Sequence, residues 1–143
     1  MQQQPEKKAP AAEDLPSFRP ARILVMDDED MVCALVKRML EPSGFSVMTS
    51  SGGQEALAMY QQALAAGVRF DAVIMDLTIP GGIGGKEAIR SLLSMDPAVR
   101  AIVSSGYADD PVMANYAAYG FKGCTAKPYT ARELRDILRQ VLK

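Results

Sequence analysis

Short apolar runs alternate with amphipathic stretches along most of the chain, and this alternation constrains the fold more than any other feature. Five apolar runs have the length and composition of buried strands, at residues 22–26, 45–48, 71–76, 101–103 and 123–126. Each is followed by apolar residues that recur at helical spacing. Strands that alternate with helices form parallel sheets joined by right-handed crossovers. We therefore predict an α/β fold, a flavodoxin-like doubly wound sheet of five parallel strands in the order 2-1-3-4-5 with helices on both faces.

Several residues indicate where the helices begin and end. Gly44 and Gly67 are placed to close the first two helices. Asp110 followed by proline predicts a helix that runs to Gly120. A capping box before the last helix is formed by Thr130 and Glu133. The stripe of the first helix is expected to contain Val32, Leu35, Val36, Met39 and Leu40.

Composition divides the chain into a tail and one domain. Residues 1–20 are rich in Gln, Pro, Ala and charge and cannot bury a core, so we predict a disordered tail or interdomain linker there and a folded domain over 21–143. The net charge is -1 with no basic stripe, which argues against nucleic acid as a direct partner. No apolar run reaches bilayer length and the N-terminus lacks a signal peptide's apolar core. We therefore expect a cytoplasmic protein without membrane contact.

The sequence contains no histidine. This excludes Ser-His-Asp and Cys-His catalysis as well as histidine-ligated zinc. It also means that any phosphohistidine must belong to another protein. The two cysteines, Cys33 and Cys124, have neither metal-site spacing nor a disulfide framework, so both are expected to be small buried apolar residues.

Polar side chains follow the predicted strands where each strand ends: Asp27 with Asp28, then Asp76, Ser105 and Lys127. Because the carboxyl ends of parallel strands lie on one edge of the sheet, these residues should converge on one crevice. Each has an ordinary alternative. The acidic pair could cap the following helix, Ser105 could be a turn serine, and Lys127 could be a solvated charge. Coincidence of all of them is the less favoured interpretation.

Together these groups suit phosphoryl chemistry. Crowded carboxylates repel one another by roughly 1–4 kcal/mol per pair at about 4 Å, and a hard divalent cation such as Mg²⁺ relieves that repulsion. Lys127 and Ser105 could then contact phosphoryl oxygens. This leaves Asp76, the central carboxylate, as a nucleophile toward phosphorus, and carboxylates do form aspartyl-phosphate intermediates.

Four motifs carry a resemblance to a known family: Val25-Met26-Asp27-Asp28, Ile74-Met75-Asp76 with Pro80-Gly81, Val103-Ser104-Ser105-Gly106, and Lys127-Pro128. In order and separation they resemble the receiver domain of two-component response regulators, over about 22–143. The amino-acid sequence at residues 76–86, 105–107 and 110–113 resembles that of receivers fused to hybrid sensor histidine kinases.

The resemblance implies a role for each site residue. Asp76 would accept a phosphoryl group from the phosphohistidine of a histidine kinase or a histidine phosphotransfer domain. Asp28 and Asp76 would ligate Mg²⁺ directly with the Thr78 backbone carbonyl, and Asp27 partly through water. Lys127 would contact the phosphate, Ser105 would move toward it, and the Lys127–Pro128 bond would be cis.

One departure from the family pattern lies in the last predicted strand. The family usually has an aromatic switch residue where this chain has Cys124. The cysteine side chain is too small to act as that switch. We therefore hypothesise that the signal is transmitted through Ser105 and the loop at 106–109, where Tyr107 is the large side chain. The sequence leaves open whether the helix after Asp110, the last strand and the last helix form a dimer face.

The leading hypothesis is a phosphoacceptor module in a phosphorelay, part of a hybrid kinase or a stand-alone single-domain regulator, and not an enzyme with an external substrate. An aspartyl-phosphate phosphatase is the competing enzyme class. Phosphatases of the haloacid-dehalogenase type require a second Asp, two residues after the nucleophile, as general acid–base. This chain has Thr78 at that position. A degenerate receiver that only binds proteins is a third class, and the intact set of polar residues argues against it.

Overall fold

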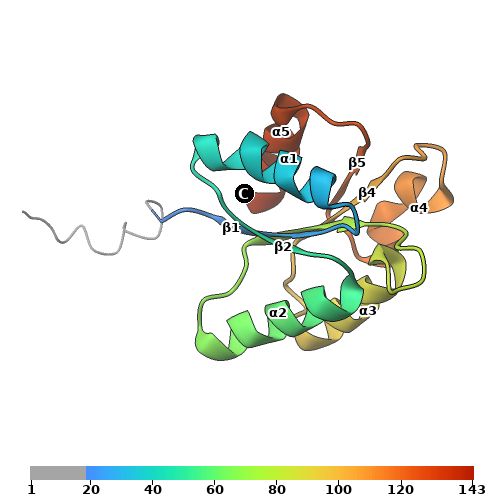
Figure 1. The fold of residues 1–143 in the computed structure, drawn as a ribbon. Helices are drawn as coiled ribbons and strands as arrows, with labels where there is room; N and C mark the ends of the chain where they lie inside the picture. The colour runs from blue at the N-terminus through green and yellow to red at the C-terminus, as the bar shows by residue number, and fades with distance from the viewer. Residues whose placement is uncertain (1–18) are drawn as a thin grey trace, which may run out of the picture.

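A computed structural model describes residues 19–143 (Figure 1). The predicted tail over 1–20 therefore lies outside the described residues, except for its last two positions. The described part contains one parallel sheet in the order β2-β1-β3-β4-β5, which confirms the predicted fold class and strand order. Its strands are β1 (Arg22–Met26), β2 (Ser46–Ser50), β3 (Ala72–Asp76), β4 (Ala101–Ser105) and β5 (Gly123–Ala126).

Helices cover both faces of this sheet (Figure 1). On one face lie α1 (Asp30–Leu40) and α5 (Ala131–Leu142); on the other lie α2 (Gly53–Ala66) and α3 (Gly85–Met95). The short α4 (Pro111–Ala114) packs its Val112 and Met113 into the same apolar cluster as α2 and α3. Two 3₁₀ turns complete the described elements, η2 (Glu41–Ser43) and η3 (Tyr116–Tyr119).

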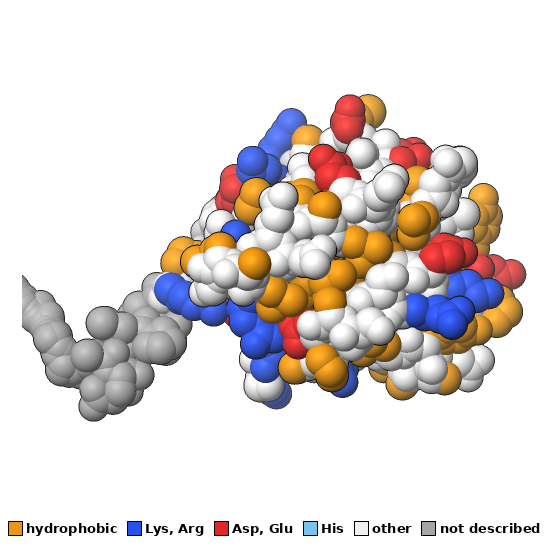
Figure 2. Space-filling view, turned by 90° about the horizontal axis from the view of Figure 1, so that it is seen from below, with side chains coloured by type: hydrophobic (Ala, Val, Ile, Leu, Met, Phe, Trp, Pro, Cys, Tyr) orange, Lys and Arg blue, Asp and Glu red, His pale blue; other side chains and the backbone are white. Residues whose placement is uncertain are grey.

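The sheet divides the core into two apolar clusters because successive strand residues point to opposite faces. Along β1, Leu24 and Met26 join the cluster beneath α2 and α3, whereas Ile23 and Val25 join the cluster beneath α1 and α5. Every residue of β3 is buried, as expected for a central parallel strand. The face formed by α2 and α3 appears in Figure 2, where hydrophobic side chains reach the surface between polar ones.

Several predicted boundaries are confirmed. The first and last strands have the predicted limits, and Gly44 and Gly67 close their helical segments in the left-handed conformation with φ of 94° and 75°. The Asp110 carboxylate accepts a hydrogen bond from the Val112 amide at 2.9 Å. The capping box of α5 is complete. The Lys127–Pro128 bond is cis.

The first helix is rotated relative to its predicted stripe. Its buried residues are Cys33, Val36 and Leu40, whereas Leu35 is 46% exposed. The prediction for Leu35 was therefore wrong, and Cys33 takes the inward position. Cys33 also donates a weak hydrogen bond from its thiol to the Asp27 carbonyl at 3.5 Å. Burial, followed by the charges of Asp27 and Asp30, raises the pKa of this thiol to about 11.

The predicted helix from Pro111 to Gly120 is wrong beyond its first turn. The α-helix ends at Ala114, Asn115 has φ −122° and ψ 35°, and a 3₁₀ turn follows. The Asn115 amide side chain donates to the Pro111 carbonyl at 3.3 Å. Asparagine side chains compete with the helical backbone in this way, which accounts for the break.

Two polar networks join elements at the edge of the sheet opposite the strand carboxyl ends. Asp71, just before β3, accepts two hydrogen bonds from the Arg19 guanidinium at 2.8 and 2.9 Å and one from the Arg22 amide at 2.7 Å. Asp96, just after α3, accepts from the Tyr60 hydroxyl at 2.6 Å and from Arg69 at 2.7 Å.

None of the helices within residues 19–143 combines the length and the apolar character needed to cross a membrane.

Candidate functional site

The polar residues that follow the strands do converge. Asp27 comes directly after β1, Asp76 ends β3, and Lys127 comes directly after β5. The Lys127 ammonium lies 2.7 Å from Asp27 Oδ2 and 3.3 Å from Asp76 Oδ2. The lysine and the acids, which are distant in sequence, thus form one cluster at the carboxyl edge of the sheet, as the parallel topology predicts.

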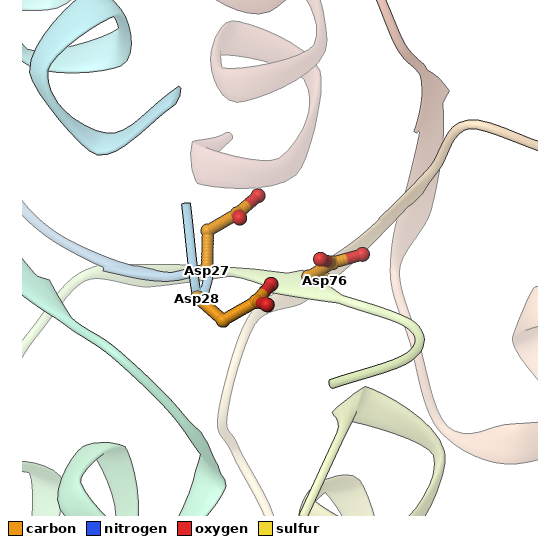
Figure 3. A group of neighbouring side chains, drawn as sticks. All are labelled: Asp27, Asp28 and Asp76. Carbon is orange, nitrogen blue, oxygen red and sulfur yellow. The ribbon is translucent and has the colours of Figure 1, made fainter. Parts of the chain in front are cut away.

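Three carboxylates lie close together at this edge of the sheet (Figure 3). Asp27, Asp28 and Asp76 each offer one oxygen, and these oxygens all lie within 4.8 Å of one another. Asp27 and Asp76 are buried, with 2% and 8% exposure, whereas Asp28 is exposed. The cluster therefore has a buried floor and a side that is open to solvent.

The residues present fit a hard divalent cation. All the side-chain donors are carboxylate oxygens, which Mg²⁺ prefers, and their mutual repulsion is only partly offset by one ammonium group. The exposed member leaves room for further oxygen ligands from water or a substrate. The described contacts do not test the predicted role of the Thr78 carbonyl.

Burial and charge act in opposite directions on the central acid. Burial, and to a smaller degree the charge of Asp27, raises the pKa of Asp76, and the Lys127 charge and a hydrogen bond from the Thr78 amide only partly oppose that rise. The lysine responds in the complementary way. Burial alone would lower the pKa of Lys127, but its hydrogen bond to Asp27 and the charges of both acids raise it. Lys127 is thus held as a cation between the acids.

Asp27 also has a structural role. Its Oδ1 accepts a hydrogen bond from the Glu29 amide at 2.9 Å, so it fixes the turn between β1 and α1. The sequence left open whether the acidic pair caps the helix. The residue that precedes α1 is Glu29, and its side chain makes no capping bond. Asp27 therefore orders this turn and lines the cluster at once.

Ser105 ends β4, and Tyr107 follows two residues later in the loop. Ser105 is 4% exposed, and its hydroxyl oxygen accepts a hydrogen bond from the Tyr107 amide at 3.0 Å. The Tyr107 side chain is 74% exposed. The turn-serine interpretation is therefore correct for this conformation, and the hydroxyl keeps its own proton for another acceptor. The predicted switch motion of this loop stays a prediction.

Cys124 differs from its predicted burial. It lies in β5, as predicted, but it is only half-buried and packs at the margin of the cluster beneath α2 and α3. Within residues 19–143, β5 is an outer strand of the sheet and pairs on one side only, with β4, which explains the partial exposure.

Sequence reasoning missed Tyr129, which is buried in the cluster beneath α1 and α5. Burial raises the pKa of Tyr129 to about 12; among nearby charges, Lys127 lowers the pKa and Asp27 and Asp76 raise it. This tyrosine therefore stays a neutral phenol near the acidic cluster. Its place two residues after Lys127 was the available signal, but a single aromatic residue after a proline indicates no particular contact.

The comparison with known families identifies the chain. The model of the response regulator receiver domain matches residues 23–139. The chain belongs to this family. The receiver domain is 30% identical over 138 residues to sensor kinase CckA of Brucella abortus, an alignment that covers 96% of this chain but 14% of that protein. It is 26% identical over 123 residues to chemotaxis protein CheY of Thermotoga maritima, covering 85% of this chain and 98% of that protein.

Solved structures agree with the receiver fold. The response regulator protein TrrA of Thermotoga maritima, crystallised in complex with Mg²⁺–BeF, superposes with a TM-score of 0.73 at 26% identity, covering 85% of this chain and 98% of that chain. The receiver domain thus corresponds to nearly the whole of two relatives and to a small part of a third.

Proposed function

We propose that this receiver domain accepts a phosphoryl group on Asp76 from the phosphohistidine of a partner protein and that the reaction requires Mg²⁺. The observation that carries the proposal is the position of the Lys127 ammonium, 2.7 Å from Asp27 and 3.3 Å from Asp76, beside the three clustered carboxylates. Positive charge next to a nucleophilic acid is what phosphoryl transfer chiefly needs. Asp27, Asp28 and Asp76 would hold the Mg²⁺.

The transfer uses one oxygen of Asp76. This oxygen forms a bond to phosphorus while the bond from phosphorus to the donor imidazole nitrogen breaks, and the electron pair of that bond returns to the nitrogen. Lys127 offsets negative charge on the transferred group, and the Ser105 hydroxyl donates a hydrogen bond to another phosphoryl oxygen. When bound, Mg²⁺ supplies further neutralisation of the phosphoryl oxygens. The domain is a stoichiometric acceptor of one phosphoryl group.

The donor must be another chain or another domain, because this sequence contains no histidine. The surface beside Lys127 supports a protein donor. A cavity of about 320 Å³ is lined by Val32 and Leu35 of α1, by Glu29 just before α1, and by Lys127, Pro128 and Tyr129 after β5. Met31, next to it on α1, is 85% exposed. Exposed apolar side chains around a charged site suit a protein partner that brings its own apolar surface.

The domain could belong to a longer kinase or stand alone as a regulator, and a different relative supports each of these two contexts. The similarity to CckA over 96% of this chain supports our proposal that the domain is the receiver part of a hybrid sensor histidine kinase. The similarity to CheY over 98% of that protein supports a stand-alone regulator as the alternative. A dimer through α4, β5 and α5 and a cytoplasmic location stay predictions.

Intact mass measurement after incubation with acetyl phosphate tests the proposal. With Mg²⁺ the parent chain should gain a single phosphoryl adduct, and without Mg²⁺ it should gain none. The Asp76→Asn variant should stay unmodified, whereas Asp30→Asn, a neighbouring exposed acid outside the carboxylate cluster, should behave like the parent. An adduct that persists in Asp76→Asn would refute the assignment. A parent chain that stays unmodified would favour a protein-binding scaffold.

A further inference from the structure

The loop that follows Asp76 is bonded to β4 at its start, and its later part packs back against its first residues. Its first amide, on Leu77, donates to the Ser104 carbonyl at 2.8 Å. At its other end Gly84 lies so close to the backbone of Leu77 and Ile79 that an added Cβ would collide with the Leu77 carbonyl oxygen and would lie 3.0 Å from the Ile79 nitrogen. Gly84 is therefore packed against both peptide neighbours of Thr78.

The far end of this loop is tethered to the start of α2. The amide of Gly53, the first residue of α2, donates to the Ile83 carbonyl at 2.8 Å. The first amides of a helix have no partner within the helix, so this bond satisfies one of them. The approach is close enough to require glycine, because a Cβ on Gly53 would lie 2.6 Å from both the carbonyl oxygen and Cγ2 of Ile83.

These contacts form a continuous path from α2 to the carboxylate cluster. Gly53 holds Ile83, and the next residue, Gly84, packs against the peptides on either side of Thr78, which lies two residues after Asp76. A cavity of about 270 Å³ beside the loop is lined by Leu77, Thr78 and Gly84 among others, so the loop has space into which it can shift.

We propose that Gly53 is a positioning residue for the metal site: by holding Ile83, it fixes the peptide of Thr78 against Asp76. The inference rests on the proposed function, because it assigns Gly53 a role in the Mg²⁺ affinity of that same site. Residues that orient metal ligands without touching the metal commonly affect affinity in this way. Gly53 is thus required for its lack of a side chain and not for an unusual backbone conformation.

An Mg²⁺ titration of the full chain followed by amide chemical shifts tests the proposal. In Gly53→Ala the loop must move away from α2, and the Mg²⁺ dissociation constant should rise on the order of 10-fold. Phosphorylation by acetyl phosphate should shift to higher Mg²⁺ concentration while its maximal rate is retained. A purely structural role would lower the melting temperature and leave the Mg²⁺ dependence unchanged.

Two control variants isolate the tether. Gly52→Ala makes the same chemical change one residue earlier, where the Cβ would meet only Ile79 Cγ2 at 3.9 Å, so its Mg²⁺ affinity should match the parent. Ile83→Ala removes the outer side chain but keeps the backbone hydrogen bond, and it should also match. If Gly53→Ala does not fold, the Gly53→Ala/Ile83→Gly variant removes the side-chain collisions, keeps the collision with the carbonyl, and should still bind Mg²⁺ more weakly.

A Gly53→Ala variant that folds and keeps the parent's Mg²⁺ affinity would overturn the positioning role alone. A parent chain that neither binds Mg²⁺ nor forms the phosphoryl adduct would overturn the proposed function and, with it, this inference.

Discussion

Asp96 shows how one buried carboxylate joins three segments of the domain. It accepts hydrogen bonds from Tyr60 on α2, from Arg69 before β3, and from the Ala98 amide at 3.1 Å. Burial alone would raise the pKa of Asp96, but the bonds from Tyr60 and Ala98 and the interaction with Arg69 outweigh burial and lower it. The folded state therefore favours the ionised form.

This predicts a stability difference that depends on pH. At neutral pH the Asp96→Asn variant should unfold with a free energy about 1.5–3 kcal/mol below that of the parent, because a charged acceptor is lost. Since the folded pKa is depressed, the advantage of Asp96 is complete above the unfolded value of about 3.9 and is lost as pH falls through the folded value. Urea denaturation at neutral and acidic pH measures it.

Asp136→Asn is the matched control, because Asp136 is an exposed acid with only a 3.6 Å contact to Arg139. It should change the free energy of unfolding little at any pH. A gap between parent and Asp96→Asn that is equally large at pH values far below and above the usual range of Asp would contradict the linkage.

The residues at the strand ends and their convergence were predictable from the sequence, whereas the contact between Gly53 and Ile83 was not. Asp27, Asp76 and Lys127 follow short apolar runs, and parallel topology then brings them to one edge. The contact between Gly53 and Ile83 joins residues that no periodic pattern relates. It depends on how tightly a loop packs against a helix, which is a property of the folded backbone.

At the scale of elements, α1 has an inner face that supports the sheet and an outer face beside Lys127. The exposed outer residues include Met31 and Leu35. Because they border the proposed phosphorylation site, α1 should form part of the donor contact.

The Leu35→Glu variant should therefore lose phosphorylation by a cognate phosphohistidine protein on the order of 10–100-fold, the effect of losing one buried leucine contact. Its phosphorylation by acetyl phosphate should equal the parent's, since the carboxylate cluster is unchanged. Radiolabel transfer assays with both donors measure the two rates. Val68→Glu, which makes the same kind of change at a 53% exposed site after α2, should affect neither rate. Equal losses with both donors would show damage to the site itself.

Element types followed from the sequence more surely than element limits or helix rotation. Both strand ends of β1 and β5 were predicted because apolar runs stop at charged or turn residues. The second strand extends two residues beyond its predicted end, since Thr49 and Ser50 pair with Val25 and Met26 although they are polar. The orientation of α1 was predicted less well because Cys33 and Leu35 lie at opposite edges of one broad apolar stripe, and packing against the sheet buries the edge with Cys33 and exposes the edge with Leu35.

At the scale of the whole molecule, Mg²⁺ binding and folding should be coupled. A cation that binds only the folded cluster stabilises it, and saturating Mg²⁺ should raise the melting temperature of the parent by about 5–10 °C. The Asp28→Asn variant should show a much smaller rise, because one cluster member is lost without disturbing a buried residue. Differential scanning calorimetry with Mg²⁺ and with a chelator measures the shift. An equal rise in Asp28→Asn would place the stabilising ion elsewhere, and Asp30→Asn should retain the full effect.

The pairing of Arg19 with Asp71 has a geometric consequence for any longer chain. It fixes the backbone before β1 at the edge of the sheet where the strands begin. The five residues of β1 separate this edge from Asp27 by about 16 Å. A phosphohistidine domain joined upstream would have to reach around the side of the receiver domain to bring its imidazole to Asp76. A freely diffusing donor could approach the carboxylate cluster directly. The length of an upstream connector would therefore determine whether phosphoryl transfer within one polypeptide can compete with transfer between two polypeptides.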